Sequence, residues 1–113
     1  MLRLRGLLIL TKYEVIIELP AQRDLHAILR YIRDILKEPD IAKRIYTSIK
    51  EQILTLKQLP LRHNIVQEQS YSVMGVRKLF VENYIVFYIV DEDKREVHIL
   101  RILYNRREWQ TLL

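Results

Sequence analysis

The sequence predicts a single α+β domain. An N-terminal strand and an antiparallel helical hairpin are expected to precede a three-stranded antiparallel meander, which completes one mostly antiparallel sheet. Two observations predict this fold. Apolar residues recur at helical spacing in residues 21–37 and 41–56, and runs rich in β-branched and aromatic residues follow them. A chain of 113 residues is long enough for one core and too short for two ordinary domains.

The stretch from residue 75 to 107 contains the strand pattern. Polar segments of hairpin length, Glu82-Asn83 and residues 91–95, interrupt it twice. Neighbouring strands joined by such short turns pair antiparallel. The three expected strands are residues 76–81, 84–90 and 97–104.

The turn positions set the expected register. The first turn places Arg77 opposite Tyr88, and the second places Tyr88 beside Ile99 and Val86 beside Arg101. One face of the sheet then carries Arg77, Tyr88 and Arg101, and we expect it to be open to solvent or to a ligand. The opposite face is expected to form the core under the helices, with Phe80, Ile85, Phe87, Ile89, Leu100 and Ile102.

The residue pattern of the N-terminal half predicts the remaining elements. Residues 13–19 form a strand with a β-branched centre, and an amphipathic helix is expected from about residue 21 to 37. Asp40 is a plausible N-cap for a second helix, which ends before Pro60. Residues 61–74 have no sustained period and are expected to form a loop, which makes them a candidate for binding or motion.

Composition indicates a regular globular protein. The net charge is +5, but Arg3, Arg5 and Lys12 contribute three of these charges in a stretch without acids. A scattered mixed-charge surface and an anionic partner are therefore equally compatible with the charge. There is no cysteine, which excludes disulfides and thiolate metal sites, and a cytoplasmic location fits best.

Residues 1–12 are interpreted as an N-terminal extension, and residues 13–113 as the domain. The apolar run from Leu7 to Leu10 is too short for a secretory signal or a membrane span, so no membrane partner is expected.

Several kinds of functional site are excluded. His26, His63 and His98 lie on a predicted helix, loop and strand, with no second metal ligand at useful spacing. Glycine occurs only at Gly6 and Gly75, which leaves no phosphate-binding glycine loop and no serine nucleophile elbow. No metal or cofactor is expected.

A cluster of cations and tyrosines remains on or at the end of one sheet. Arginine offers planar donors that suit phosphate, and tyrosine can stack on a base or transfer a proton, so the combination suits RNA chemistry. A set of ordinary surface cations is the competing interpretation, and spacing alone favours it. The cluster consists of Arg77, Lys78, Tyr88, Arg101, Tyr104, Arg106 and Arg107.

The order of elements and the stretch GVRKLFVENYIVFYIVDEDKREVHILRILYNRREW resemble the RelE/ParE superfamily of bacterial toxins. The resemblance extends from Tyr13 onward. Its most specific parts are the glycine-any-arginine start at Gly75, the aromatic-rich strand NYIVFY and the strand end ILRILYNRREW.

The resemblance implies the toxin of a type II toxin-antitoxin (plasmid stabilisation) module, neutralised by a cognate antitoxin that wraps over it. RelE-like members are endonucleases that cut messenger RNA in the ribosome, whereas ParE-like members poison DNA gyrase. Whether the chain is an enzyme, an mRNA interferase, depends on the branch to which it belongs. The resemblance leaves homo-oligomerisation open.

For the nuclease branch, Arg77 matches an arginine that holds the scissile phosphate, and Tyr104 matches a tyrosine at the end of the last strand; these two are the expected catalytic residues. Some nuclease members carry histidine where this chain has Leu103, and many carry arginine where it has Ile85. No general base is evident, although Glu51 is an acid of a suitable kind. The expected substrate-binding residues are Lys78, Tyr88, Arg101, Arg106 and Arg107, and Trp109 in the tail is an expected antitoxin contact.

Because Arg77 and Tyr104 are retained, ribosome-dependent mRNA cleavage is slightly favoured. Inhibition of DNA gyrase is the close alternative, since ParE-like members often carry histidine at the Tyr104 position followed by basic residues. A non-toxic nucleic-acid-binding or structural module is the third possibility.

Overall fold

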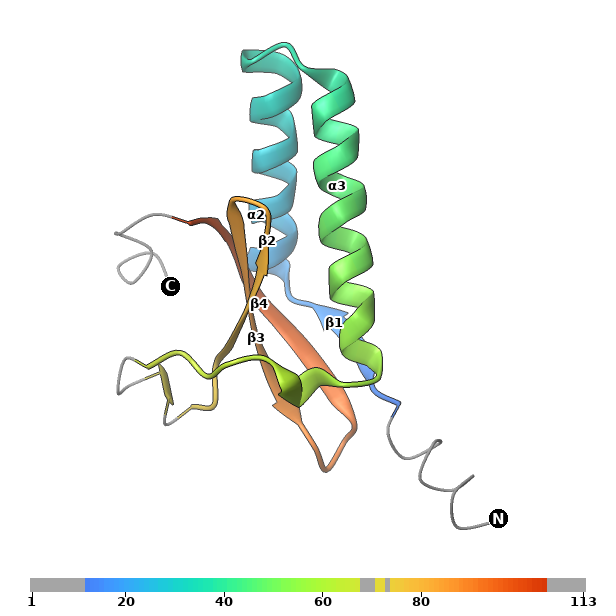
Figure 1. Cartoon of the computed structure of the whole chain (residues 1–113), viewed down its shortest axis with the longest axis vertical. Helices are drawn as coiled ribbons and strands as arrows, with labels where there is room; N and C mark the ends of the chain where they lie inside the picture. The colour runs from blue at the N-terminus through green and yellow to red at the C-terminus, as the bar shows by residue number, and fades with distance from the viewer. Residues whose placement is uncertain (1–11, 68–70, 73, 106–113) are drawn as a thin grey trace.

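The computed structural model describes residues 12–67, 71–72 and 74–105. A helical hairpin packs against one face of a four-stranded sheet and projects beyond its end (Figure 1). The strand order is β1-β4-β3-β2, with β1 parallel to β4 and the other neighbours antiparallel. The predicted α+β fold is therefore confirmed, and the parallel β1 makes the sheet mixed.

The elements follow the predicted order. The strands are β1 (Glu14–Ile17), β2 (Arg77–Val81), β3 (Tyr84–Asp91) and β4 (Glu96–Tyr104). The hairpin consists of α2 (Leu19–Arg30), the π-helical turn η1 (Tyr31–Ile35) and α3 (Pro39–Leu54). Two 3₁₀ turns follow, η2 (Thr55–Lys57) and η3 (Pro60–Arg62). No helix in the described part of the chain is long and apolar enough to cross a membrane.

The helix starts lie earlier than the sequence suggested. α2 begins at Leu19 because Pro20 fits the first turn of a helix, where its missing N–H costs no hydrogen bond. Asp40 is not the N-cap of α3 as predicted; the N-cap is Glu38, and Asp40 lies inside the first turn, where a carboxylate favours the helix dipole.

The predicted register is confirmed for β2 and β3, since Arg77 pairs with Tyr88 and Val81 with Tyr84. Tyr88 also pairs with Ile99 as predicted. The predicted pairing of Val86 with Arg101 is wrong. A β-bulge between Phe87 and Tyr88 shifts the register by one residue, so Val86 pairs with Ile102.

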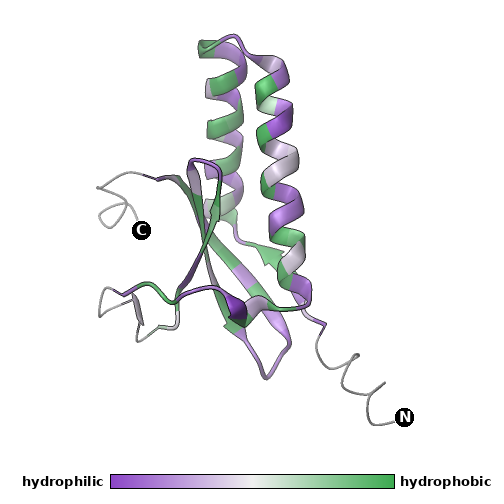
Figure 2. Cartoon of the chain, viewed as in Figure 1, coloured by the Kyte–Doolittle hydropathy of each residue, from purple (hydrophilic) through white to green (hydrophobic). Residues whose placement is uncertain are grey.

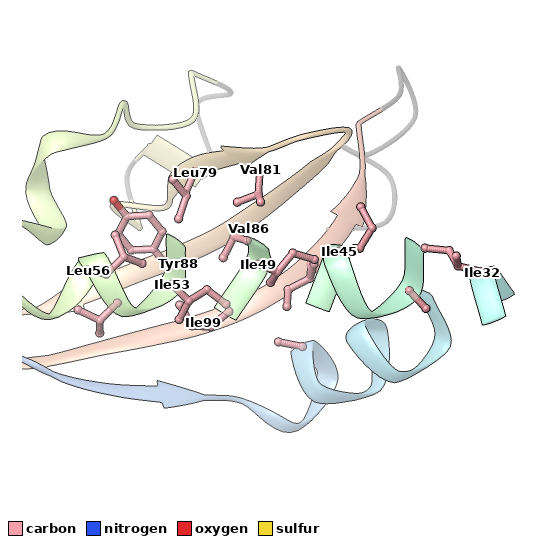
Figure 3. Close-up of a cluster of buried hydrophobic side chains, with 14 residues drawn as sticks. Ile32, Ile45, Ile49, Ile53, Leu56, Leu79, Val81, Val86, Tyr88 and Ile99 are labelled. Carbon is pink, nitrogen blue, oxygen red and sulfur yellow. The ribbon is translucent and has the colours of Figure 1, made fainter. Parts of the chain in front are cut away.

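The assignment of the two sheet faces was wrong for β2, β3 and most of β4, whereas Ile102 lies in the core under the hairpin as predicted. Tyr88 is fully buried on the face that packs against the helices, together with Val86 and Ile99 (Figure 3). Phe80, predicted to be in the core, is 53% exposed. The core under the hairpin is formed by Ala21, Ile32, Ala42, Ile45, Ile49, Ile53, Leu56, Leu79, Val81, Val86, Tyr88, Val97, Ile99 and Ile102.

The opposite face is also apolar, which explains the error. Ile85, Phe87 and Leu103 are buried there, not under the hairpin, and Ile89 and Leu100 pack against them. Val66 and Val76, from the segment between η3 and β2, complete this second cluster. Because a loop covers the face that the helices leave open, both faces of the central strands are hydrophobic (Figure 2). The alternation of residue types therefore could not identify the helix-covered face.

Candidate functional site

Arg77 and Tyr88 lie side by side, as predicted, but both hold the η3 turn. The Tyr88 hydroxyl donates a hydrogen bond of 2.6 Å to the carbonyl of Pro60. Nη1 of Arg77 donates to the carbonyls of Leu61 (3.1 Å) and His63 (2.6 Å). The paired positions on β2 and β3 therefore fasten the segment that follows α3 to the sheet.

This environment changes the acid-base properties of the site. Burial raises the pKa of Tyr88 to about 12, although the positive charges of Arg77 and Arg62 oppose that shift. Burial lowers the pKa of His63, and Arg62 and Arg77 lower it further. The ring of His63 meets that of Tyr88 edge to face, with centroids 6.3 Å apart. At neutral pH, Tyr88 is a protonated structural donor.

Arg101 is bound to the helical hairpin. Its Nε and Nη2 donate to the two carboxylate oxygens of Asp24 on α2, at 2.6 and 2.9 Å. The backbone N–H of Ile102 donates to the same carboxylate at 3.0 Å. The hydrogen bond with Asp24 raises the pKa of Arg101. Arg101 was predicted to share an open face with Arg77, and instead it joins β4 to α2.

Tyr104 lies at the far end of the sheet from Arg77. It pairs with Tyr84, and the two rings meet edge to face with centroids 5.7 Å apart. Four residues along β3 and two strand spacings separate the Arg77 and Tyr104 positions, roughly 16 Å between their Cα atoms. Tyr104 is 53% exposed, whereas the Arg77 guanidinium is engaged by η3. The two expected catalytic groups therefore do not converge on one phosphate.

The other expected site residues are dispersed. Lys78 lies on β2 with its ammonium 5.6 Å from the centre of the Phe80 ring, an arrangement that suits a cation–π interaction. Glu51 is exposed on α3 and lines hollows beside η2 and beside the end of β2. Arg106, Arg107 and Trp109 lie outside the described residues.

Sequence reasoning missed Asp24 as a partner of Arg101. The sequence signal was weak, since a lone acid on the polar side of an amphipathic helix is ordinarily solvated. Asp24 matters because α2 begins where β1 ends, which leaves the Ile102 N–H at an uncovered edge of β4. Among the described residues, no group of three or more His, Cys, Asp or Glu side chains could hold a metal ion.

Comparison of the sequence with known proteins identifies a matching family. The sequence model of the ParE toxin of type II toxin-antitoxin systems, parDE, matches residues 15–109. No curated protein matches the chain.

Two solved structures share the fold. A structure of the chromosomal ParDE toxin-antitoxin system from P. aeruginosa is 26% identical, with a TM-score of 0.69, and covers 85% of this chain and 99% of its own. The toxin-antitoxin complex RelBE2 from Mycobacterium tuberculosis is 23% identical, with a TM-score of 0.61, and covers 83% of this chain and 99% of its own. The family match spans most of the described domain, and the chain therefore belongs to the ParE toxin family of type II toxin-antitoxin systems.

Proposed function

We propose that this protein is a toxin that inhibits DNA gyrase and is neutralised by a cognate antitoxin, with residues 13–113 as the toxin domain. The observation that carries the choice of target is the engagement of Arg77. Cleavage of messenger RNA needs an arginine aimed at the scissile phosphate, and the Nη1 of Arg77 is aimed instead at the backbone carbonyls of Leu61 and His63.

The rest of the expected nuclease site supports the same choice. Arg101 is paired with Asp24, and Tyr88 is a buried donor to Pro60. Ribose 2′-OH attack needs a base, an acid and cations within reach of one phosphate. Among the described residues the expected groups point to separate parts of the fold, which does not favour a nuclease.

The family match points in the same direction. It is to the ParE toxin, and the resemblance implies gyrase poisoning for ParE-like members. The P. aeruginosa relative is the ParDE system, which supports an antitoxin partner for this chain. The exposed Tyr104, together with Arg106, Arg107 and Trp109, remains our proposed contact region for the target or the antitoxin.

Expression in bacteria tests the proposal. Induction of the intact chain should slow growth, cause DNA breaks that disappear in a strain with a toxin-resistant gyrase, and leave transcripts uncut. Co-expression of the protein encoded beside the toxin gene should restore growth. An induced stop-codon variant of the same gene is the control.

The second candidate, ribosome-dependent mRNA cleavage, predicts translation-dependent transcript cuts without DNA breaks, and that result would overturn the choice of gyrase. Unimpaired growth at full expression would favour a non-toxic binding module and overturn the toxin assignment.

A further inference from the structure

A row of basic residues lies along the exposed side of α2 and η1. Its helical members follow one another at spacings of three or four residues, which places them on the same side of a helix. All of them are exposed, whereas the apolar side of α2 packs against the core. The row consists of Arg23, His26, Arg30 and Arg33, followed by Lys37 in the turn between η1 and α3. That turn lies at the end of the hairpin that projects beyond the sheet (Figure 1).

Contacts within the row show that its side chains lie close together. Nη2 of Arg30 is 3.4 Å from Nε2 of His26. Arg33 donates two hydrogen bonds to Asp34, at 2.8 and 3.0 Å. The hydrogen bond from Arg33 lowers the pKa of Asp34, and the charges of Arg30 and Lys37 lower it further. Three cations are therefore gathered around one exposed carboxylate.

The row carries positive charge that its own helix does not neutralise. Arg23, Arg30 and Lys37 take part in no ion pair within the described part of the chain. The acids between residues 19 and 37 are Asp24 and Asp34. The carboxylate of Asp24 is engaged by β4, so Asp34 is the acid that remains beside the row. A concentration of like charges on one surface attracts a partner with many negative charges.

The dimensions of the row suit the backbone of a nucleic acid. From Arg23 to Lys37 the row extends roughly 20 Å, at about 1.5 Å per residue. One strand of duplex DNA carries a phosphate about every 3.4 Å along the helix axis, so about six phosphates pass beside a row of this length. The planar fork of an arginine side chain suits the oxygens of a phosphate.

A lipid surface fits the row less well than a nucleic acid does. A basic helix that binds a membrane inserts its apolar side between the lipid head groups. In α2 that side, with Leu25, Ile28 and Leu29, is already packed against the core of the domain. The cations of the row are therefore available to a partner, and the apolar side of the same helix is not.

We propose that the row from Arg23 to Lys37 binds the phosphate backbone of duplex DNA without regard to its sequence. The proposal deepens the proposed function and rests on it in one respect: the DNA expected beside the toxin is the duplex on which gyrase acts. Contacts with phosphates position a protein on DNA but do not read its bases. The row holds the toxin against the DNA while other surfaces contact the enzyme.

Binding of a labelled DNA duplex to the full chain, measured by fluorescence anisotropy, tests the proposal. A duplex of about 20 base pairs is longer than the row. With four cations on phosphates, the logarithm of the binding constant should fall against the logarithm of the salt concentration with a slope of about −3 to −4. The NMR amide signals of residues 22–37 should shift, and those of β2 and β3 should not. Vesicles of phosphatidylcholine and phosphatidylglycerol are the competing probe.

Matched variants separate the row from the net charge. The double variant Arg23→Gln with Arg30→Gln should weaken binding at least about tenfold and make the salt slope shallower by about 2. Lys50→Gln with Lys57→Gln removes the same charge from α3 and η2, outside the row, and should change the affinity less than about twofold. Asp34→Asn should raise the affinity about threefold, because it removes the acid beside the row.

Equal losses in the two double variants would show that only the net charge matters, and they would overturn the assignment of the row. An affinity independent of salt, amide shifts confined to other elements, or binding to the vesicles but not to the duplex would also overturn it. If the intact chain poisons gyrase but does not bind the duplex, the DNA-binding row fails and the proposed function stands. If the chain binds the duplex through the row but causes no gyrase-dependent breaks, the proposed function fails and the row stands.

Discussion

At the scale of single residues, Asp24 makes the most concentrated set of contacts between the hairpin and the sheet. Its carboxylate accepts both donors of the Arg101 fork and the N–H of Ile102, and its side chain is only 14% exposed. We expect Asp24→Asn to lower the free energy of unfolding by about 2 kcal/mol, because a partly buried arginine and an edge N–H both lose their charged acceptor. Urea denaturation measures this change.

A matched control for Asp24 is available in the same helical hairpin. Asp34 also accepts two hydrogen bonds from an arginine, Arg33, but both side chains are more than half exposed. Asp34→Asn should therefore leave the stability nearly unchanged, because water screens this exposed pair. Equal effects of the two substitutions would show that Asp24 does not join the layers.

Tyr88 gives a prediction about pH. Its pKa in the folded chain is about 12, against an ordinary value of 10, so the protonated hydroxyl is favoured by folding. A raised pKa stabilises the fold fully below pH 10, and that stabilisation is lost as the pH rises through 12.

In Tyr88→Phe the titrating group is absent. Near neutral pH this variant should be about 1 kcal/mol less stable than the parent, because the Pro60 carbonyl loses its donor. The deficit should disappear or reverse between pH 10 and 12, since only the parent loses about 2 kcal/mol there. Chemical denaturation across that range measures it, and a constant deficit would contradict the assignment of the raised pKa to Tyr88.

At the scale of elements, Arg77 anchors η3 to the start of β2. Arg77→Ala should leave the sheet folded but release the carbonyls of Leu61 and His63, so amide exchange in residues 61–66 should rise about tenfold. Lys78→Ala, on the neighbouring position of the same strand, is the control and should leave that exchange unchanged. If both substitutions give the same exchange pattern, the Arg77 contacts do not hold the turn.

The turn into β2 depends on Gly75. Its φ of +74° lies in the left-handed region, and a Cβ built there meets nothing within 4 Å. The cost of Gly75→Ala is therefore backbone strain alone, and we expect a loss of about 1 kcal/mol in unfolding free energy. Gly75→Asn should cost less, since asparagine tolerates this region better than alanine. Thermal unfolding of the two variants checks the order, and an equal or larger loss for asparagine would point to a steric cause.

The element order and the register of β2 with β3 were predictable because turn spacing and residue pattern depend on local sequence. The face of the sheet on which each side chain lies was not predictable. Ile85 and Phe87 are as hydrophobic as Val86 and Tyr88, and they are covered by a loop that supplies Val66, while Val86 and Tyr88 lie under the hairpin. The bulge after Phe87, which moved Arg101 by one position, also has no local signal.

The candidate site shows a related limit. The sequence correctly predicted that Arg77 lies beside Tyr88. It could not reveal that the carbonyl of His63 accepts a hydrogen bond from Arg77 and that the carbonyl of Pro60 accepts one from Tyr88. Contacts between residues distant in the chain depend on tertiary packing, whereas the pairing of adjacent strands depends on their turn. The positions of the site residues were therefore easier to predict than the hydrogen bonds that their side chains form.

At the scale of the whole molecule, the two faces of the sheet are both covered and the helical hairpin projects beyond them. The expected phosphate-binding groups, Arg77, Tyr88 and Arg101, form hydrogen bonds that hold these layers together. This arrangement suits the proposed action, which would take place through surfaces presented to a protein partner.

An assay with purified components tests most directly whether the chain acts on gyrase or on messenger RNA. The chain is incubated with DNA gyrase, ATP and supercoiled plasmid, and in parallel with ribosomes translating a defined messenger, each with Tyr104→Phe as a second sample. If the chain poisons gyrase, linear plasmid should form only when gyrase is present, and the messenger should stay intact. Cleavage of the messenger on translating ribosomes, with no plasmid breakage when gyrase is present, would contradict the choice of gyrase.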